Sequence, residues 1–464
     1  MRRGNDKVTA QARATGETEP SGCRVHLFPS GGTPLAGWLT VFAGYAAVVS
    51  VVTHGPISAW GVWAAGGYGA AALAAWRGRG SAVPLLIGLS GALIAPAIWL
   101  AIRWPGSGET GETAVVARAA SLLLHHGSPY LPAGQLLSAQ SYNPYLPAMS
   151  LFGLPQAAGL PGLLGNPASW LAATSVVLVA AAIGVGMPYR TWRRAAGAET
   201  LRNTALAVLS PVLALPIALG VTDPPIIALI CLALACASRS AARRSASGTS
   251  ADGVARPGGG ASRWITWIGL AAVAVGTACA MKATAWPAFP VIAGMIAARD
   301  GMRAAARFTA TATATAVLLI AGLAPALTSQ PRAFTDNIIA YPLGLTRRLT
   351  PAASPLPGHM LASTGNAGHL AAIGLLLLAG AGVAVSLVLR PPRDVRAAAI
   401  RLAVGLTLLF TLAPAARFGY FAYPAALLAW LALTRLGRTA ASSPESVPAR
   451  RGSTSHLTWL MCGR

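Results

Sequence analysis

The sequence predicts an all-α fold: a polytopic integral membrane protein with about twelve transmembrane helices. Three observations lead to this prediction. Hydrophobic residues make up 54% of the 464-residue chain and charged residues only 10%, which is too little charge to cover the surface of a soluble protein of this length. Apolar runs long enough to cross a bilayer recur along the chain. Short arginine clusters separate these runs.

The apolar runs are predicted spans because about 30 Å of hydrocarbon needs roughly 20 apolar residues in a helix. Polar segments at 1–35 and 439–464 flank the transmembrane region 36–438, and we expect both to be disordered tails. The first tail lacks the apolar core of a cleaved signal. The runs lie at residues 36–53, 57–76, 82–102, 169–187, 201–220, 224–238, 264–281, 284–298, 308–328, 368–390, 397–413 and 417–435.

Arginines assign the two sides of the membrane, because basic residues favour cytoplasmic loops. With the N-terminal tail in the cytoplasm and the runs alternating from there, every arginine-rich connection falls on the cytoplasmic side. The sequence therefore predicts a cell-membrane protein with both termini cytoplasmic and large outer loops at 104–168 and 329–367. The cytoplasmic connections carry Arg77, Arg79, Arg190, Arg193, Arg194, Arg202, Arg239, Arg243, Arg244, Arg256, Arg263, Arg299, Arg303, Arg307, Arg390, Arg393, Arg396, Arg401, Arg435 and Arg438.

The strong positive charge does not indicate nucleic acid. There are 35 basic and 12 acidic residues, a formal net charge of +23, but membrane orientation accounts for the arginines and no nucleic-acid-binding motif is present. Five cysteines have neither metal-ligand spacing nor an evident pairing, so no disulfide framework is expected.

The first outer loop contains an unusual neutral segment, "GSPYLPAGQLLSAQSYNPYLPAMSLFGLP", at 127–155. Its five prolines predict a rigid loop. Its tyrosines Tyr130, Tyr142 and Tyr145 fit an aromatic belt at the membrane interface. Before it, the spacing of apolar residues over 112–126 predicts an amphipathic helix that lies along the membrane surface.

Acidic residues are rare, and four of them fall on the outer side: Glu109, Glu112, Asp223 and Asp336. Charge near hydrocarbon is costly, which favours a functional role for at least one of them. The alternative is that these acidic residues serve only to make the outer loops polar. Asp223 precedes two prolines and also suits a helix N-cap, and both roles are compatible.

A few basic residues fall on the predicted outer side, although most basic residues of this chain fall on the cytoplasmic side. Lys282 is one of only two lysines, and Arg347 and Arg348 form the one adjacent basic pair in an outer loop. Such residues suit an anionic partner, such as a lipid-linked phosphate. Snorkelling of Lys282 to the interface, and binding of the arginine pair to lipid headgroups, are the alternatives.

The order of these features resembles a known family. A first-loop acidic residue is followed by "GSPY", by "YNPYLP", by Asp223 after a helix, and by Lys282-Ala283-Thr284 before a Pro-rich helix. This order is similar to that of the polyprenol-phosphate-mannose-dependent mannosyltransferases of the GT-C fold, and of related uncharacterised actinobacterial membrane proteins, over residues 109–290. The family's first-loop acid is usually Asp, whereas this chain offers only Glu109 or Glu112.

The resemblance implies a glycosyltransferase that moves a sugar, with mannose expected, from a polyprenyl-phosphate donor to a glycan or lipid acceptor of the cell envelope. Glu112, Asp223 or Glu109 would be the catalytic base. Lys282, Arg347 and Arg348 would bind the donor phosphate. The sugar and acceptor would contact Tyr130, Tyr142, Asn143 and Tyr145.

Two other classes of protein fit the sequence. Twelve helices with both termini inside suit a secondary transporter, although the charged candidates lie at the ends of the spans instead of in their middles. A non-catalytic lipid- or glycan-binding protein on the same fold is the second alternative, because Glu replaces the usual Asp. No metal is predicted, and the sequence does not decide whether a divalent cation takes part.

Overall fold

The computed structural model describes residues 32–103, 111–187, 196–247, 259–328, 331–346, 348 and 350–442. Over these residues the chain is helical and forms no β-strand, and its one isolated β-bridge joins Ala353 to Ala416. The predicted all-α class is therefore confirmed.

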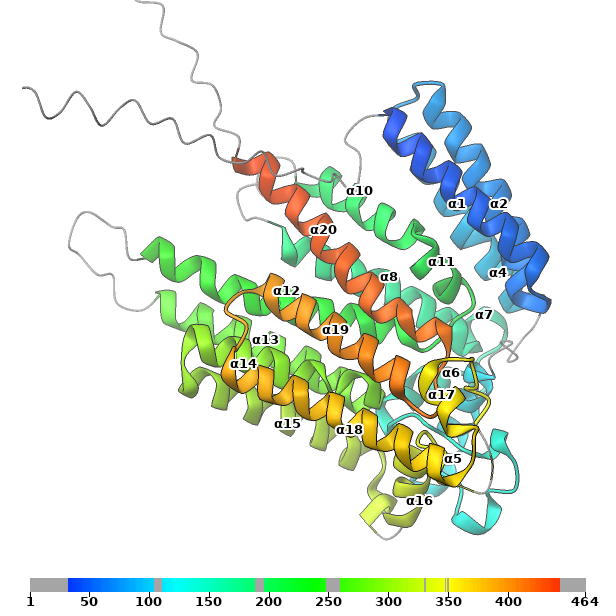
Figure 1. Ribbon diagram of the computed structural model, residues 1–464. Coiled ribbons are helices and arrows are strands. Elements are labelled where there is room, and N and C mark those ends of the chain that lie inside the picture. Colours follow the sequence, from blue (N-terminus) through cyan, green and yellow to red (C-terminus); the bar gives the residue numbers. More distant parts are fainter. Residues whose placement is uncertain are drawn as a thin grey trace, which may run out of the picture.

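Long helical segments follow one another along the chain (Figure 1). They are α1 (Gly32–Val52), α2 (Gly55–Trp76), the run α3 (Ala82–Leu89), η1 (Ser90–Ile94) and α4 (Ala95–Arg103), α8 (Pro167–Gly186), α10 (Ala196–Leu209), α11 (Pro211–Ala218), α12 (Asp223–Ser247), α13 (Gly259–Met281), α14 (Ala288–Asp300), α15 (Met302–Leu323), α18 (Asn366–Leu389), α19 (Val395–Leu412) and α20 (Ala422–Ser442).

The remaining elements connect these segments, and those that Figure 1 labels, α5, α6, α7, α16 and α17, gather at one end of the bundle. The remaining elements are α5 (Glu112–His126), η2 (Ala133–Gln135), η3 (Ala139–Ser141), η4 (Pro147–Gly153), α6 (Leu154–Ala157), α7 (Gly162–Gly165), η5 (Ala283–Ala285), η6 (Pro325–Thr328), α16 (Pro331–Thr335), η7 (Asp336–Ala340), α17 (Pro357–Ala362) and η8 (Phe418–Phe421). We call this end, defined by α5, α6, α7, α16 and α17, the loop end.

The predicted membrane character is confirmed, whereas the number of crossings stays a prediction. Each of the twelve predicted runs coincides with a helical segment. In the described part of the chain, six helices are long and apolar enough to cross a membrane, or seven if α10 and α11, bent by 74°, count as one span. Helix α14 coincides with a predicted run but is not among these six, because its 13 residues make it only about 20 Å long at 1.5 Å per residue. The six helices are Leu35–Val52, Ala82–Arg103, Pro167–Gly186, Met302–Leu323, Asn366–Leu389 and Val395–Leu412.

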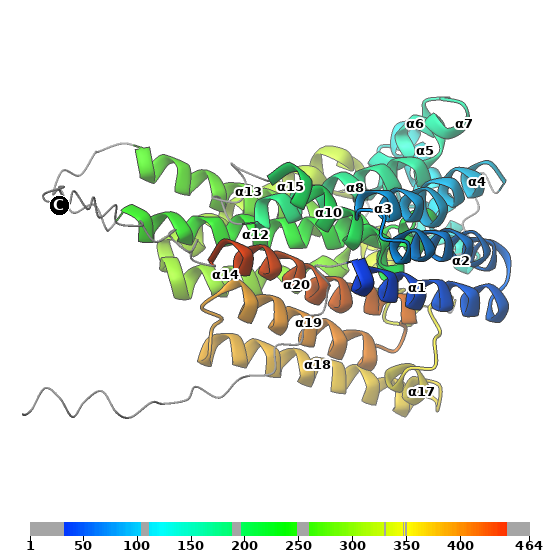
Figure 2. The same cartoon turned by 90° about the horizontal axis from the view of Figure 1, so that it is seen from above.

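Helix α12 forms the centre of the bundle. From Ile226 to Ala237 every side chain except Leu232 is buried, which suits a helix that is apolar on all sides. It packs against α8 and α13, and α13 packs in turn against α15. Figure 2 shows α18 at one edge and α1 and α2 to the side of this core. The first residue of α12 therefore lies where several helices meet.

Helix α5 has the bounds predicted for the amphipathic helix, Glu112–His126, and glycines with positive φ stand at both of its ends, Gly111 and Gly127. It packs against η4 of the same outer loop. A side chain at Gly153 in η4 would overlap the Val116 carbonyl. The described part of the first predicted outer loop is thus a packed unit and holds Glu112 at the start of α5.

The two ends of the bundle differ in the connections that they carry. Arginine-rich turns between α14 and α15 and between α18 and α19 lie at the end opposite to the loop end (Figure 1). The sides of the membrane, and the direction in which the bundle crosses it, stay predictions.

Backbone contact joins α2 to η1. A Cβ at Gly67 would lie 2.6 Å from the carbonyl carbon of Gly91, and one at Gly91 would lie 2.5 Å from the Cα of Gly67. The indole of Trp60 donates a 3.0 Å hydrogen bond to the carbonyl oxygen of Ala92 within the π turn. Glycine is required at this crossing because any side chain would separate the two segments.

We expect Gly67→Ala to lower the free energy of unfolding in detergent by about 1–3 kcal/mol, the usual cost of overpacking. Gly66→Ala is the matched control, because a Cβ at Gly66 meets nothing within 4 Å and alanine favours a helix by about 1 kcal/mol. Equal stabilities of the two variants would contradict the proposed contact.

Cysteine labelling tests the orientation. In a chain with Cys23 and Cys462 replaced by Ser, one exposed cysteine at a time is introduced at Ser363 or Arg79. The remaining cysteines, at 231, 236 and 279, are buried. A membrane-impermeant maleimide should label Ser363→Cys in intact cells, and Arg79→Cys only after permeabilisation. The reverse pattern would show that the predicted sides are exchanged.

Candidate active site

Three buried charged residues lie together at the loop end. They are Glu112, Asp223 and Lys282, which are 5–7% exposed. Glu112 begins α5, Asp223 begins α12, and Lys282 follows the last residue of α13. With Thr222, Arg417 and Tyr423 they form what we call the polar cluster.

The centre of the polar cluster is an ion pair. The ammonium of Lys282 lies 2.5 Å from Oδ1 of Asp223, and the hydroxyl of Tyr423 donates a 2.8 Å hydrogen bond to the same oxygen. The Tyr423 hydroxyl is also 2.8 Å from Oγ1 of Thr284. Both hydrogen bonds to the Asp223 carboxylate end on Oδ1, and no described residue donates to Oδ2.

Thr222 connects this ion pair to the second carboxylate. Its backbone N–H and its hydroxyl donate to Oε2 of Glu112 at 3.0 Å and 2.7 Å, and Lys282 donates to the same hydroxyl at 3.3 Å. Oε1 of Glu112 faces Arg417 at 3.6 Å. The two carboxylates and the two cations thus form one continuous network.

Two aromatic rings face the ammonium of Lys282. The ring of Tyr145 is centred 5.3 Å from Nζ and that of Tyr420 5.2 Å, distances at which a cation is attracted to the face of a ring. Burial lowers the pKa of Lys282, but the carboxylates of Asp223 and Glu112 outweigh it, so the pKa of Lys282 is raised above its ordinary value. The ammonium therefore stays charged. Burial raises the pKa of Tyr145 well above its ordinary value, which keeps that phenol protonated.

Local backbone geometry brings these groups together. Gly220 turns the chain before α12 with φ +65°, where a side chain would overlap Ala168. Asp223 then stands at the N-terminus of α12, where the helix dipole favours a negative charge. The carbonyl oxygen of Met281 accepts a 3.0 Å hydrogen bond from the N–H of Leu146, which ties the first outer loop to the end of α13.

The proline-rich segment 127–155 supports the polar cluster. The hydroxyl of Tyr130 donates to the carbonyl oxygen of Tyr145 at 2.9 Å. The amide nitrogen of Asn143 donates to Pro129 at 3.1 Å, and its amide oxygen accepts from the N–H of Tyr145 at 3.1 Å. The ring of Tyr142 stacks on a tyrosine of the second outer loop, Tyr341, at 4.2 Å and 3°. These contacts hold Tyr145 against Lys282.

The structure therefore brings together four of the sequence-predicted site residues: Glu112, Asp223, Lys282 and Tyr145. Arg348 is exposed, and its carbonyl oxygen accepts a hydrogen bond from Thr346. The hydrogen-bonding groups of Asn143, predicted to bind a sugar, are used within the loop. Glu109 and Arg347 lie outside the described residues. The fourth outer acid, Asp336, starts η7 and is only partly buried.

Four contributors to the site were not predicted: Thr222, Arg417, Tyr420 and Tyr423. One signal was available in "ARFGYFAYP" at 416–424, which repeats the tyrosine and proline content of segment 127–155. It also places an arginine on the predicted outer side, against the charge bias. Hydroxyl residues such as Thr222 carry no comparable signal, because threonine is common in apolar helices.

The polar cluster offers no metal site of its own. In the described ranges no group of three or more His, Cys, Asp or Glu side chains is placed to hold a metal ion. Its two carboxylates are instead neutralised by Lys282 and Arg417. What the arrangement can supply is a carboxylate oxygen that accepts a proton, together with cationic side chains that stabilise an anion.

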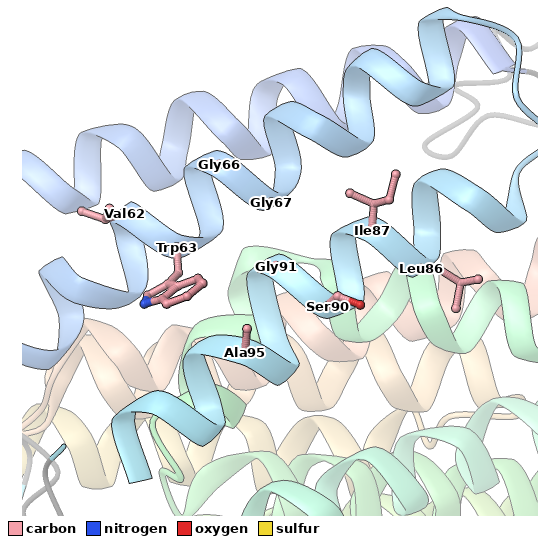
Figure 3. A pocket seen from close by; sticks show the side chains of 9 residues that line it. All are labelled: Val62, Trp63, Gly66, Gly67, Leu86, Ile87, Ser90, Gly91 and Ala95. Atoms are coloured by element: carbon pink, nitrogen blue, oxygen red, sulfur yellow. The ribbon is translucent and has the colours of Figure 1, made fainter. Parts of the chain in front are cut away.

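A separate apolar groove lies between α2 and the run from α3 to α4 (Figure 3). Its volume is about 790 Å³, and Trp63, Leu86 and Ser90 are among the residues that line it. No residue of the polar cluster contributes to its lining.

Comparisons with known proteins identify no family. No protein-family model, curated protein or solved structure matches the chain.

We expect Lys282→Met to lower the free energy of unfolding by about 3–5 kcal/mol, because it leaves the buried carboxylate of Asp223 without its cation. The double variant Lys282→Met/Asp223→Asn removes both charges and should recover most of that loss. Denaturant titration in detergent measures both. A double variant as unstable as the single one would show that the ion pair is not the cause.

Proposed function

We propose that the protein is a membrane glycosyltransferase that transfers a sugar, with mannose the first candidate, from a polyprenyl phosphate to a glycan or lipid acceptor of the cell envelope. The observation that carries the proposal is the polar cluster: two buried carboxylates and two cations at the ends of apolar helices. The sequence resemblance to the polyprenol-phosphate-mannose-dependent mannosyltransferases supplies the donor class.

The reaction requires one bond to form and one to break. The acceptor hydroxyl oxygen attacks C1 of the sugar, while the bond from C1 to the phosphate oxygen breaks and its electron pair leaves with the polyprenyl phosphate. The hydroxyl proton passes to a carboxylate. Because the leaving group is already an anion, a cation that stabilises it contributes more than an acid that protonates it.

Asp223 is the better candidate for the base. Its Oδ1 is held by Lys282 and Tyr423, which leaves Oδ2 for the acceptor hydroxyl. In Glu112 both oxygens have partners, since Oε2 binds Thr222 and Oε1 faces Arg417. We therefore assign Glu112 to positioning, although it starts α5 at the place of the family's first-loop acid.

The position of the polar cluster favours a transferase over a transporter. A polyprenyl-linked sugar keeps its tail in the hydrocarbon and its sugar at the boundary, so its reacting carbon lies near the ends of the spans. Transporters hold their polar residues near the middle of the membrane, whereas Glu112, Asp223 and Lys282 stand at the starts or ends of helices. In this proposal the loop end faces outward.

Activity is tested with membranes that contain the protein, radiolabelled polyprenyl-phosphate-mannose and a crude extract of envelope lipids and glycans. Asp223→Asn should reduce transfer about 10²–10⁴-fold, the usual contribution of a general base. Glu112→Gln should reduce transfer as well, but by less, because it weakens the hold on Thr222 and Arg417.

Asp394→Asn is the matched control. Asp394 is exposed and caps α19 through a 2.7 Å hydrogen bond from the N–H of Ala397, and asparagine caps a helix equally well. Its transfer should equal that of the wild type. Wild-type membranes that move no sugar from any polyprenyl phosphate donor would contradict the proposed function, and full activity of Asp223→Asn would contradict the assignment of the base.

A further inference from the structure

If the proposed function holds, the leaving phosphate needs a cation, and the polar cluster contains two. Lys282 already has partners within the protein. Its ammonium pairs with Asp223 at 2.5 Å and donates to Thr222 at 3.3 Å, while the rings of Tyr145 and Tyr420 face it. Its side chain is only 7% exposed. An anion that bound Lys282 would have to displace the carboxylate that holds the site together.

Arg417 is more exposed than Lys282 and is held more loosely. Its side chain is 27% exposed, and its contact with Oε1 of Glu112 is loose, at 3.6 Å. A guanidinium has five N–H donors in a planar fork, which matches two oxygens of a phosphate. Among the described residues, this one long contact with Glu112 leaves most of the guanidinium donors available to a ligand.

The backbone around Arg417 is held firmly while its side chain stays accessible. The N–H of Ser354 donates to the carbonyl oxygen of Ala416 at 3.0 Å, and the N–H of Phe418 donates to the hydroxyl of Ser354 at 3.2 Å. The carbonyl oxygen of Arg417 itself accepts from the N–H of Tyr420 at 3.0 Å. The second outer loop thus fixes the base of the arginine and leaves its guanidinium at the edge of the polar cluster.

The second outer loop, which holds the backbone beside Arg417, is itself fixed to the first outer loop. The ring of Tyr341 in the second loop stacks on the ring of Tyr142 in the first, with the ring centres 4.2 Å apart. The backbone that supports Arg417 therefore belongs to a braced pair of loops.

We propose that Arg417 is the anion-binding residue of the site and that its ligand is the phosphate group of a polyprenyl phosphate, while Lys282 serves to hold Asp223. Glu112 orients the guanidinium through Oε1. This division assigns the lipid phosphate to the partly exposed edge of the polar cluster and the proton-accepting carboxylate to its interior.

The test measures binding and does not depend on sugar transfer. Purified protein in detergent is titrated with farnesyl phosphate, and farnesol and inorganic phosphate are titrated in parallel. The wild type should bind farnesyl phosphate at least tenfold more tightly than farnesol. Arg417→Gln should lose at least tenfold in affinity for farnesyl phosphate, since a charge-assisted hydrogen bond contributes at least this much.

Arg332→Gln is the matched control, because Arg332 is an exposed arginine of the second outer loop that has no contact with the polar cluster among the described residues, and its affinity should equal that of the wild type. Thermal unfolding confirms that Arg417→Gln is folded. Inorganic phosphate that binds as tightly as farnesyl phosphate would identify a free-phosphate site and overturn the assignment to a lipid.

Undiminished binding by Arg417→Gln would overturn the role of Arg417, and so would equal binding of farnesyl phosphate and farnesol by the wild type. Neither result bears on sugar transfer, so failure of this inference is distinguishable from failure of the proposed function. The transfer assay alone decides the latter.

Discussion

The ion pair between Lys282 and Asp223 is the interaction on which the rest of the site depends. Two buried charges each lose several kcal/mol of hydration free energy. Their mutual attraction compensates this loss only when further hydrogen bonds complete the geometry. Tyr423 and Thr222 supply those bonds. The pair therefore fixes the end of α13 against the start of α12 and draws in α20 through Tyr423. Through Thr222 and Glu112 it also fixes the start of α5.

The outer loops explain how so few charges can be placed so accurately. The prolines of segment 127–155 and its bonds, such as that from Tyr130 to the backbone of Tyr145, leave the loop little freedom. The loop presents one ring face to the ammonium of Lys282. The second outer loop meets it through the stacked rings of Tyr142 and Tyr341. The two loops together behave as a scaffold.

The scarcity of charged residues explains which parts of the site could be predicted from the sequence. Glu112, Asp223 and Lys282 stood out because a chain with few charges placed them at helix ends, and helical spacing gave the bounds of α5. The partners of these residues could not be found in that way. Tyr423 lies 200 residues from Asp223 and Thr222 lies 110 from Glu112, so only the packing of the bundle brings them together. The helical runs followed from hydropathy, whereas the pairing of helices depends on contacts such as that between Gly67 and Gly91, which leave no periodic trace.

The π turn η1 has a consequence for the helical run that contains it. A π turn holds one residue more than the α-helical turn it replaces, and one residue corresponds to about 100° of rotation around a helix axis. The segments on its two sides, α3 and α4, therefore present faces that a continuous α-helix would not align. This offset lets one uninterrupted span meet α2 through Gly91 and Ala92 and still turn its far end to Asn166, whose side chain donates to the carbonyl oxygen of Ala101. The register of α4 relative to α3 is thus set by a single inserted residue.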